Sequence, residues 1–102
     1  MGLIVVLETE NGEPVQKVED PTNILHRILP PIGDSNFQCL NYIDRYGDTV
    51  FNHLQADQFL KEWNSRKTQV NTPEEMAVFK EIEDLALRLK KELHLYLKFY
   101  GD

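Results

Sequence analysis

Hydrophobic residues recur at two spacings along this chain, every second position in some stretches and every third or fourth in others. Residues 3–9 are apolar and rich in β-branched side chains, which is typical of a strand near the centre of a sheet. Asn11 and Gly12 follow and predict a two-residue type I′ turn, because both central positions of that turn need positive φ. Residues 14–19 then return as the second strand of a hairpin.

A first helix is predicted to begin at Asp20 and to end at Pro30. Asp20 can accept hydrogen bonds from the free backbone amides of the first turn, and Pro21 already has the φ of a first helical position. The apolar residues that share one face of this helix are Ile24, Leu25, Ile28 and Leu29. Residues 31–38 are predicted to form a loop, because Pro, Gly, Asp, Ser and Asn dominate them.

Residues 40–44 and 49–53 alternate polar and apolar side chains and predict a second hairpin, with its turn at residues 45–48. Gly47 is expected to supply a left-handed residue in that turn. Residues 56–66 are predicted to form the second helix, because their apolar side chains recur at helical spacing: Phe59, Leu60 and Trp63.

A capping sequence marks the start of the third helix. Thr72 can cap the helix, Pro73 takes the first helical position, and Glu75 is predicted to bond back to the cap amide in a capping box. The helix is expected to run to about Glu92. Residues 94–100 then alternate, which predicts a last strand with one aliphatic and one aromatic face.

The predicted element order is ββα-ββ-αα-β. Strand faces need apolar cover, and amphipathic helices supply it, so the sequence predicts an α+β fold of two layers. In this prediction a mostly antiparallel sheet of five strands packs against three helices. The length of 102 residues indicates a single α+β domain that spans residues 1–102.

The charge and the termini narrow the classes of function. The formal net charge is −6, which repels phosphate backbones and argues against nucleic acid as a partner. The apolar run at the N-terminus ends after Leu7, which is too short for a signal peptide or a membrane span. A lone Cys39 excludes an internal disulfide. We therefore expect a cytoplasmic protein that does not bind a membrane.

Three segments resemble a group of small uncharacterised bacterial proteins: Tyr46–Asn52 (YGDTVFN), Asp20–Asn23 (DPTN) and Leu95–Asp102 (LYLKFYGD). The likeness covers most of the chain, from the first hairpin to the terminal Gly-Asp. It implies a compact bacterial cytosolic domain. No activity is established for the group, so the resemblance implies no catalytic role.

A polar cluster around the second predicted hairpin is the main candidate for chemistry. Asp44, Asp48, Asn52 and His53 could bind a metal ion or perform acid–base catalysis, as in a hydrolase-like enzyme. The alternative is structural, because Asp beside a turn often accepts hydrogen bonds from local backbone amides.

Other signatures of catalysis or metal binding are missing from the sequence. No two of the histidines have the i, i+4 spacing of a helical zinc site, and Cys39 stands alone. The nucleophile-elbow, P-loop and dinucleotide-binding motifs are also missing. We therefore predict no catalytic residue, no metal site and no cofactor.

Four aromatic residues are candidates for a self-association or ligand surface: Tyr46, Tyr96, Tyr100 and Trp63. Tyr96 and Tyr100 share the strand face opposite the aliphatic one. Tyrosine and tryptophan are enriched at interface centres, because they bury much area and keep one polar atom. The alternative is that helices within one copy cover both faces of the strand.

Acidic residues gather on the first predicted hairpin and its exit: Glu8, Glu10, Glu13, Glu19 and Asp20. This set is a candidate interaction surface for a basic protein, for example a nuclease toxin, because acidic patches speed association with cationic partners. The alternative is that the charges guard the hairpin edge against pairing with other strands.

Three functions follow from these candidates. The first is a non-catalytic protein-interaction module, immunity-like or regulatory, that binds through its acidic face. The second is a self-associating domain, such as a homodimer, that binds a small ligand at or near the contact between copies. The third is a hydrolase-like enzyme that uses Asp44, Asp48 and His53.

Overall fold

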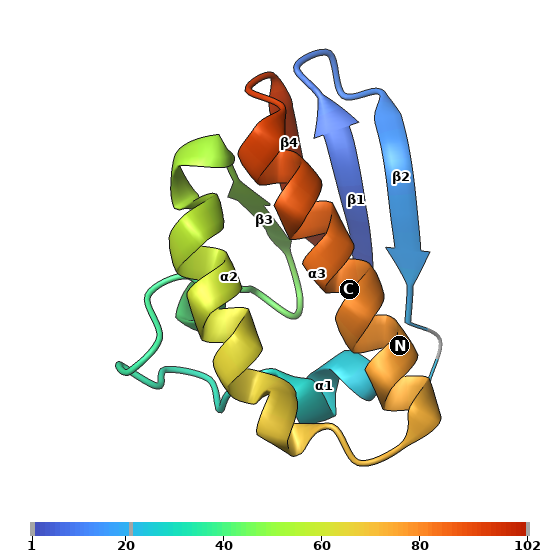
Figure 1. Cartoon of the computed structure of the whole chain (residues 1–102), viewed down its shortest axis with the longest axis vertical. Helices are drawn as coiled ribbons and strands as arrows, with labels where there is room; N and C mark the ends of the chain where they lie inside the picture. The colour runs from blue at the N-terminus through green and yellow to red at the C-terminus, as the bar shows by residue number, and fades with distance from the viewer. Residues whose placement is uncertain (1, 21, 102) are drawn as a thin grey trace.

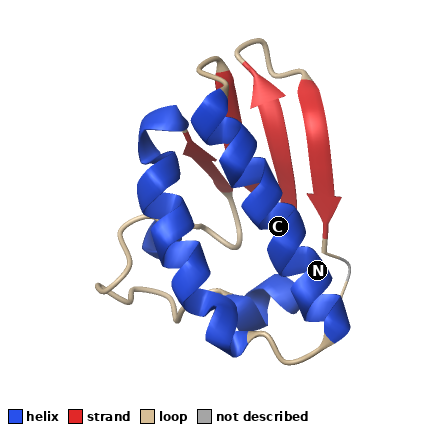
Figure 2. Ribbon diagram, viewed as in Figure 1, coloured by secondary structure: helices blue, strands red, loops and turns tan. Residues whose placement is uncertain are grey.

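The computed structural model describes residues 2–20 and 22–101, and its strands form one antiparallel sheet. The strands are β1 (Ile4–Thr9), β2 (Pro14–Glu19), β3 (Asp48–Phe51) and β4 (Leu95–Tyr100). Their order across the sheet is β2-β1-β4-β3, and every neighbouring pair is antiparallel. Figure 2 draws the strands in red. The two central strands, β1 and β4, therefore come from opposite ends of the sequence.

Two of the three α-helices pack on one face of this sheet and leave the other face open, while the first helix lies beyond one end of the strands (Figure 1). The helices are α1 (Ile24–Ile28), α2 (Ala56–Ser65) and α3 (Pro73–Lys91). Three short 3₁₀ turns complete the described elements: η1 (Leu40–Tyr42), η2 (His53–Gln55) and η3 (Arg66–Gln69). The predicted α+β class with three helices is confirmed, but the described sheet has four strands where five were predicted.

The missing strand is the segment 40–44, which forms the turn η1 and no ladder. The carboxylate of Glu62 explains the difference, because it accepts hydrogen bonds from the backbone amides of Gln38, Cys39 and Leu40 at 2.9 Å. These amides are held in a tight turn by a side chain from α2. As a result β3 has no hairpin partner and pairs with β4 instead.

Both predicted turns differ in detail from the structure. Gly12 has φ 79° while Asn11 is not left-handed, and Thr9 N donates to Glu13 O at 2.9 Å. This hairpin loop therefore has three residues, with one left-handed glycine in place of a type I′ pair. Gly47 is not left-handed either. A Cβ there would lie 2.7 Å from Asp44 Oδ2, so a larger residue at this position would displace the Asp44 carboxylate.

Asp20 holds the entry to α1, although the helix begins later than predicted. Its Oδ1 accepts from Ile24 N and its Oδ2 from Leu25 N, both at 2.8 Å. Asn23 precedes the helix in a left-handed conformation with φ 58°. Asp20 is only 2% exposed, so both oxygens are used inside the protein. The predicted role of Pro21 lies outside the described residues.

The start of α3 follows the prediction closely. Thr72 Oγ1 accepts from Glu75 N at 3.1 Å, and Pro73 is the first helical residue. The reciprocal contact is shifted by one residue, because Glu75 Oε1 accepts from Asn71 N at 2.8 Å and not from the cap amide. Glu75 Oε2 also accepts from Arg27 Nε at 2.7 Å, which ties this end of α3 to α1.

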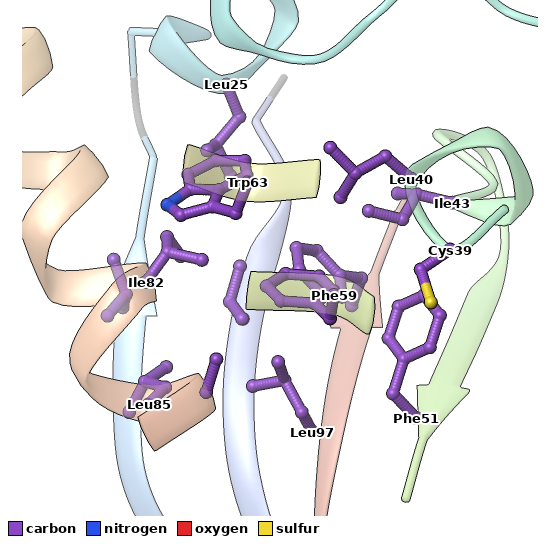
Figure 3. Packing of buried hydrophobic residues seen from close by; sticks show 14 of the residues in the cluster. Leu25, Cys39, Leu40, Ile43, Phe51, Phe59, Trp63, Ile82, Leu85 and Leu97 are labelled. Carbon is purple, nitrogen blue, oxygen red and sulfur yellow. The ribbon is translucent and has the colours of Figure 1, made fainter. Parts of the chain in front are cut away.

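Stacked aromatic rings link the helices to the sheet in the core (Figure 3). The ring of Trp63 stacks on Phe79 with centroids 5.2 Å apart, and on Phe59 at 6.0 Å. Phe59 in turn contacts Phe51 of β3 and Phe99 of β4. Trp63 Nε1 donates to Phe79 O at 3.0 Å, so the one polar atom of the indole is satisfied in the core.

Candidate functional site

All four strands contribute side chains to the sheet face that points away from the helices. Side chains alternate along a strand, and the register fixes which of them share this face. We call it the open face and define it by ten residues: Ile4, Val6 and Glu8 of β1, Lys17 and Glu19 of β2, Tyr96, Lys98 and Tyr100 of β4, and Asp48 and Val50 of β3.

Three polar side chains meet at the centre of the open face. Glu8 Oε1 lies 2.9 Å from Lys98 Nζ, and Tyr100 Oη donates a hydrogen bond to Glu8 Oε2. In the ladder Glu8 is opposite Tyr96 while Tyr100 is opposite Ile4, so Glu8 and Tyr100 must lean toward each other along the strands. They meet over the pair that lies between them, Val6 and Lys98. This explains how Val6 is only 6% exposed on a face without helices.

The charge of Glu8 is stabilised by these two neighbours. Burial would raise the pKa of Glu8, but the hydrogen bond from Tyr100 and the ion pair with Lys98 outweigh it, and the pKa is lowered. The same contacts raise the pKa of Tyr100 and of Lys98, because both groups interact favourably with the carboxylate in their protonated forms. The centre of the open face is therefore a closed network of one anion, one cation and one phenol.

Apolar and aromatic side chains surround this network. Ile4 is 37% exposed and Val50 is 48% exposed, and they stand on strands on either side of β4. Tyr96 and Tyr100 lie between them and are half-buried. The open face therefore carries two exposed aliphatic side chains and the half-buried Tyr96 beside its polar centre, and tyrosine is enriched at protein interfaces.

The acidic set predicted from the hairpin does not form one surface. Glu8 is buried on the open face, and Asp20 is buried at the start of α1. Glu10 pairs with His94 at 2.8 Å, and Glu19 lies 3.5 Å from Lys17. Glu13 is exposed at the hairpin. The five carboxylates therefore do not form one exposed face, because folding buries Glu8 and Asp20. Binding of a basic partner through the three exposed carboxylates stays a prediction.

The aromatic candidates divide in a similar way. Tyr96 and Tyr100 lie on the open face, as their shared strand face predicted. Tyr46 is 77% exposed in the turn before β3, close to the end of β4 because Gly101 N donates to Gly47 O at 2.8 Å. Trp63 is 0% exposed and cannot contribute to a surface. Its helical spacing with Phe59 had already indicated burial.

The structure does not bring Asp44, Asp48 and His53 together. Asp44 Oδ1 accepts from Tyr46 N at 2.8 Å and shapes the turn. Asp48 begins β3 and His53 follows its far end, so roughly 10 Å or more of extended strand separates them. Among residues 2–20 and 22–101, no group of three His, Cys, Asp or Glu side chains is placed to hold a metal ion. The turn interpretation of Asp44 is the one that the contacts support.

Cys39 is also unsuited to nucleophilic chemistry in this fold. Its side chain is buried, and burial together with the nearby negative charge of Glu62 raises the pKa of the thiol to about 11. The thiolate is the reactive form, so Cys39 stays protonated and inert at neutral pH.

Glu62 is the important polar residue that the sequence analysis missed. It is 5% exposed and accepts from three backbone amides and from Gln58 Nε2 at 2.7 Å. Burial raises the pKa of Glu62, but these hydrogen bonds together lower it by more, so the pKa lies below its ordinary value. Its position gave a signal, because an acid three residues after Phe59 and next to Trp63 lies beside the buried stripe of α2. An open depression of about 480 Å³ adjoins Glu62.

The fold and these sites define an α+β protein in which one face of the antiparallel sheet is not covered by helices. The sequence matches no protein-family model, no curated protein and no solved structure. Its resemblance to small uncharacterised bacterial proteins therefore stays a prediction. None of the helices in the described part of the chain is long and apolar enough to span a membrane.

Proposed function

We propose that this protein is a non-catalytic protein-interaction module, immunity-like or regulatory, that binds its partner through the open face. One observation carries the proposal: on a sheet face without helices, exposed Ile4 and Val50 and half-buried Tyr96 surround the closed polar centre of Glu8, Lys98 and Tyr100. The proposal replaces the acidic hairpin with the open face as the contact surface. It places the protein in the cytoplasm, where a single unpaired cysteine is the usual state.

The polar centre suits the open face to binding. Glu8, Lys98 and Tyr100 already satisfy one another, so a partner that covers them need not supply a counter-charge. Their positions on β1 and β4 are fixed by the central ladder of the sheet. A surface that is ordered before binding loses little conformational entropy when the partner arrives.

The size of the open face limits what it can bind alone. Four strands about 4.8 Å apart and six residues of about 3.3 Å each give roughly 400 Å² of flat area. A stable interface buries about 800 Å² on each partner. The partner therefore extends beyond the sheet, and the turn at the end of β4 that carries the exposed Tyr46 is a candidate for the additional contact.

A matched pair of lysine variants tests the proposal. Val50→Lys places a charge on the open face, and Leu87→Lys places the same charge on α3, where Leu87 is 40% exposed. The immobilised chain is exposed to lysate of cells that naturally express it, and captured proteins are identified by mass spectrometry. We expect a partner that the wild type and Leu87→Lys retain and that Val50→Lys loses. Equal capture by both variants would contradict the open face as the contact surface.

The salt dependence of capture reports the chemistry of the partner. A net charge of −6 speeds association with a basic protein, and this effect weakens as salt screens the charges. Loss of capture in high salt is expected for a basic partner. Capture that resists salt would indicate a partner held mainly by the aliphatic and tyrosine side chains.

A second candidate function is a self-associating domain that holds a small ligand between copies. The position of Tyr46 favours it, because its side chain is exposed and its backbone lies beside Gly101 at the end of β4, the strand that carries Tyr96 and Tyr100. Sedimentation across a dilution series tests it, and a strict monomer at every concentration would exclude it.

A further inference from the structure

The strand β2 forms an outer edge of the sheet and leaves one side of its backbone unpaired. Figure 1 shows β2 as the outermost strand, and five of its six residues are exposed. An edge strand presents free N–H and C=O groups along its length and is a template for pairing with another strand. Natural proteins therefore guard such edges with proline, bulges or repelling charges.

The guarding features that block pairing in every register, a proline and a register shift, are present only at the start of β2. Pro14 has no amide hydrogen to donate, and the register between β1 and β2 shifts next to it, between Leu7 and Glu8. The second half, residues 16–19, is regular and pairs with β1 without interruption. Its charges are Lys17 and Glu19, which have opposite signs and share the open face. Charges of opposite sign repel a second strand only in some registers.

We infer that two copies of the chain pair antiparallel along β2, with the two-fold axis at Val18. In an antiparallel pair centred on one residue, positions at equal distance on either side face each other. Lys17 of each copy therefore faces Glu19 of the other copy, which gives two opposite-charge pairs per dimer. A pair centred on Lys17 or on Glu19 would instead place like charges face to face, so the charges select the Val18 register.

The contacts within one copy leave both charges available for this pairing. The side chain of Lys17 is 53% exposed and that of Glu19 is 64% exposed, and their ion pair within one strand is 3.5 Å long. Such an exposed pair contributes little to folding. Their exchange for cross-strand partners in a second copy therefore does not disturb the core.

Pairing along β2 would also enlarge the surface of the proposed function. The two-fold axis of an antiparallel strand pair is perpendicular to the sheet, so the helices of both copies lie on one side and the two open faces join on the other. The joined face has eight strands and roughly twice the area, about 800 Å², which reaches the size of a stable interface. Only this consequence rests on the proposed function, because the pairing itself depends on β2 alone.

A charge-reversal series with purified full-length chain tests the dimer and its register. Sedimentation equilibrium from about 1 µM to about 500 µM measures the dissociation constant of the dimer. Lys17→Glu and Glu19→Lys each turn two attractive pairs into repulsive ones, and we expect at least roughly tenfold weaker dimerisation. The double reversal Lys17→Glu/Glu19→Lys restores opposite charges, and it should return the constant to within about threefold of the wild type. Lys67→Glu, exposed on η3, is the matched control and should have no effect.

Each alternative outcome overturns a defined part of the inference. A wild-type chain that stays monomeric over the whole range excludes the dimer. A dimer that ignores the single reversals, or that the double reversal fails to restore, excludes the Val18 register. The proposed function is tested separately by partner capture. If a monomeric chain loses its partner on Val50→Lys, the dimer is excluded while the proposed function stands.

Discussion

On the helix side of the sheet, Leu7 and Phe99 are 0% exposed beneath the helices, while on the open face Val6 and Glu8 are each 6% exposed with only neighbouring side chains above them. Hydrophobic contact with the helices buries the first pair. On the open face, the side chains of Glu8 and Tyr100 lean together over Val6. An ion pair with Lys98 and a hydrogen bond from Tyr100 hold Glu8 there. The comparison shows that a sheet face can be well ordered and still be available to a partner.

A second contrast concerns the two buried carboxylates that are tied into networks beside the sheet. Glu62 on the helix side binds the backbone of another segment and fixes its conformation. Glu8 on the open face binds two side chains of the neighbouring strand. We therefore expect changes on the helix side to affect folding and changes on the open face to affect mainly binding.

The largest loss in the free energy of unfolding is expected for Trp63→Ala. This change leaves a cavity between α2 and α3 and removes two stacked ring contacts. We expect a loss of about 3–5 kcal/mol in the free energy of unfolding, measured by urea denaturation. Leu87→Ala on the exposed side of α3 is the control and should change it by less than about 0.5 kcal/mol. Equal losses would mean that the aromatic stack does not organise the core.

The second largest loss of stability is expected for Glu62→Gln, which removes the charge that the three loop amides bind. We expect a loss of about 2–3 kcal/mol, because hydrogen bonds to a buried charged group are the strong ones. Glu81→Gln on the exposed side of α3 is the matched control and should be nearly neutral. Hydrogen exchange at Cys39 and Leu40 should speed up only in Glu62→Gln. Unchanged exchange there would show that another contact holds η1.

The charge of Glu62 also makes the free energy of unfolding depend on pH. The folded-state pKa of Glu62 lies below its ordinary value of 4.5, so its stabilisation is fully present above pH 4.5 and is lost as pH falls through the folded pKa. Wild-type stability should therefore fall with acid below this point. The difference between wild type and Glu62→Gln should shrink over the same window. A difference that stays constant down to the acid limit would contradict the role of the charge.

A smaller effect is expected for Tyr100→Phe on the open face. It removes the hydrogen bond to Glu8 and keeps the ring, so we expect a loss of about 1 kcal/mol in stability. The pKa of Glu8 should rise, because one of the contacts that lowers it is gone. Tyr96→Phe on the same strand face is the matched control. Carbon-detected NMR titration of Glu8 measures the shift, and an unchanged pKa would exclude the network.

The smallest effect on folding is expected for Val50→Lys, the variant that should abolish partner capture. Val50 is 48% exposed on a sheet edge, so its replacement should change the free energy of unfolding by less than about 0.5 kcal/mol. Thermal unfolding measured beside the capture experiment checks this. A large loss of stability would contradict the expectation that changes on the open face affect mainly binding.

Much of this fold could be predicted from local signals in the sequence. Each of these signals depends on residues only a few positions apart. Examples are the cap at Thr72, the alternation from Leu95 to Tyr100 and the apolar stripe of α2. The candidate site was predicted less well. Tyr96 and Tyr100 were placed on the correct strand face, whereas Trp63 was assigned both to the core and to a surface.

The remaining features needed contacts between distant segments. The segment 40–44 has the alternation of a strand, but Glu62, more than 20 residues away, binds the amides of Cys39 and Leu40 where this segment begins, and residues 40–42 form η1. Glu8 belongs to an acidic hairpin in the sequence, yet Lys98 and Tyr100 draw it into the open face.

The sequence alone therefore determined the helices, most strands and their apolar sides, because periodicity and capping are local properties of the chain. Only the tertiary structure decided which carboxylates are buried, how many strands the sheet has and which face stays open. The physical reason is that a buried charge is stable only beside its partners, and the partners of Glu8 and Glu62 come from segments far away in the sequence.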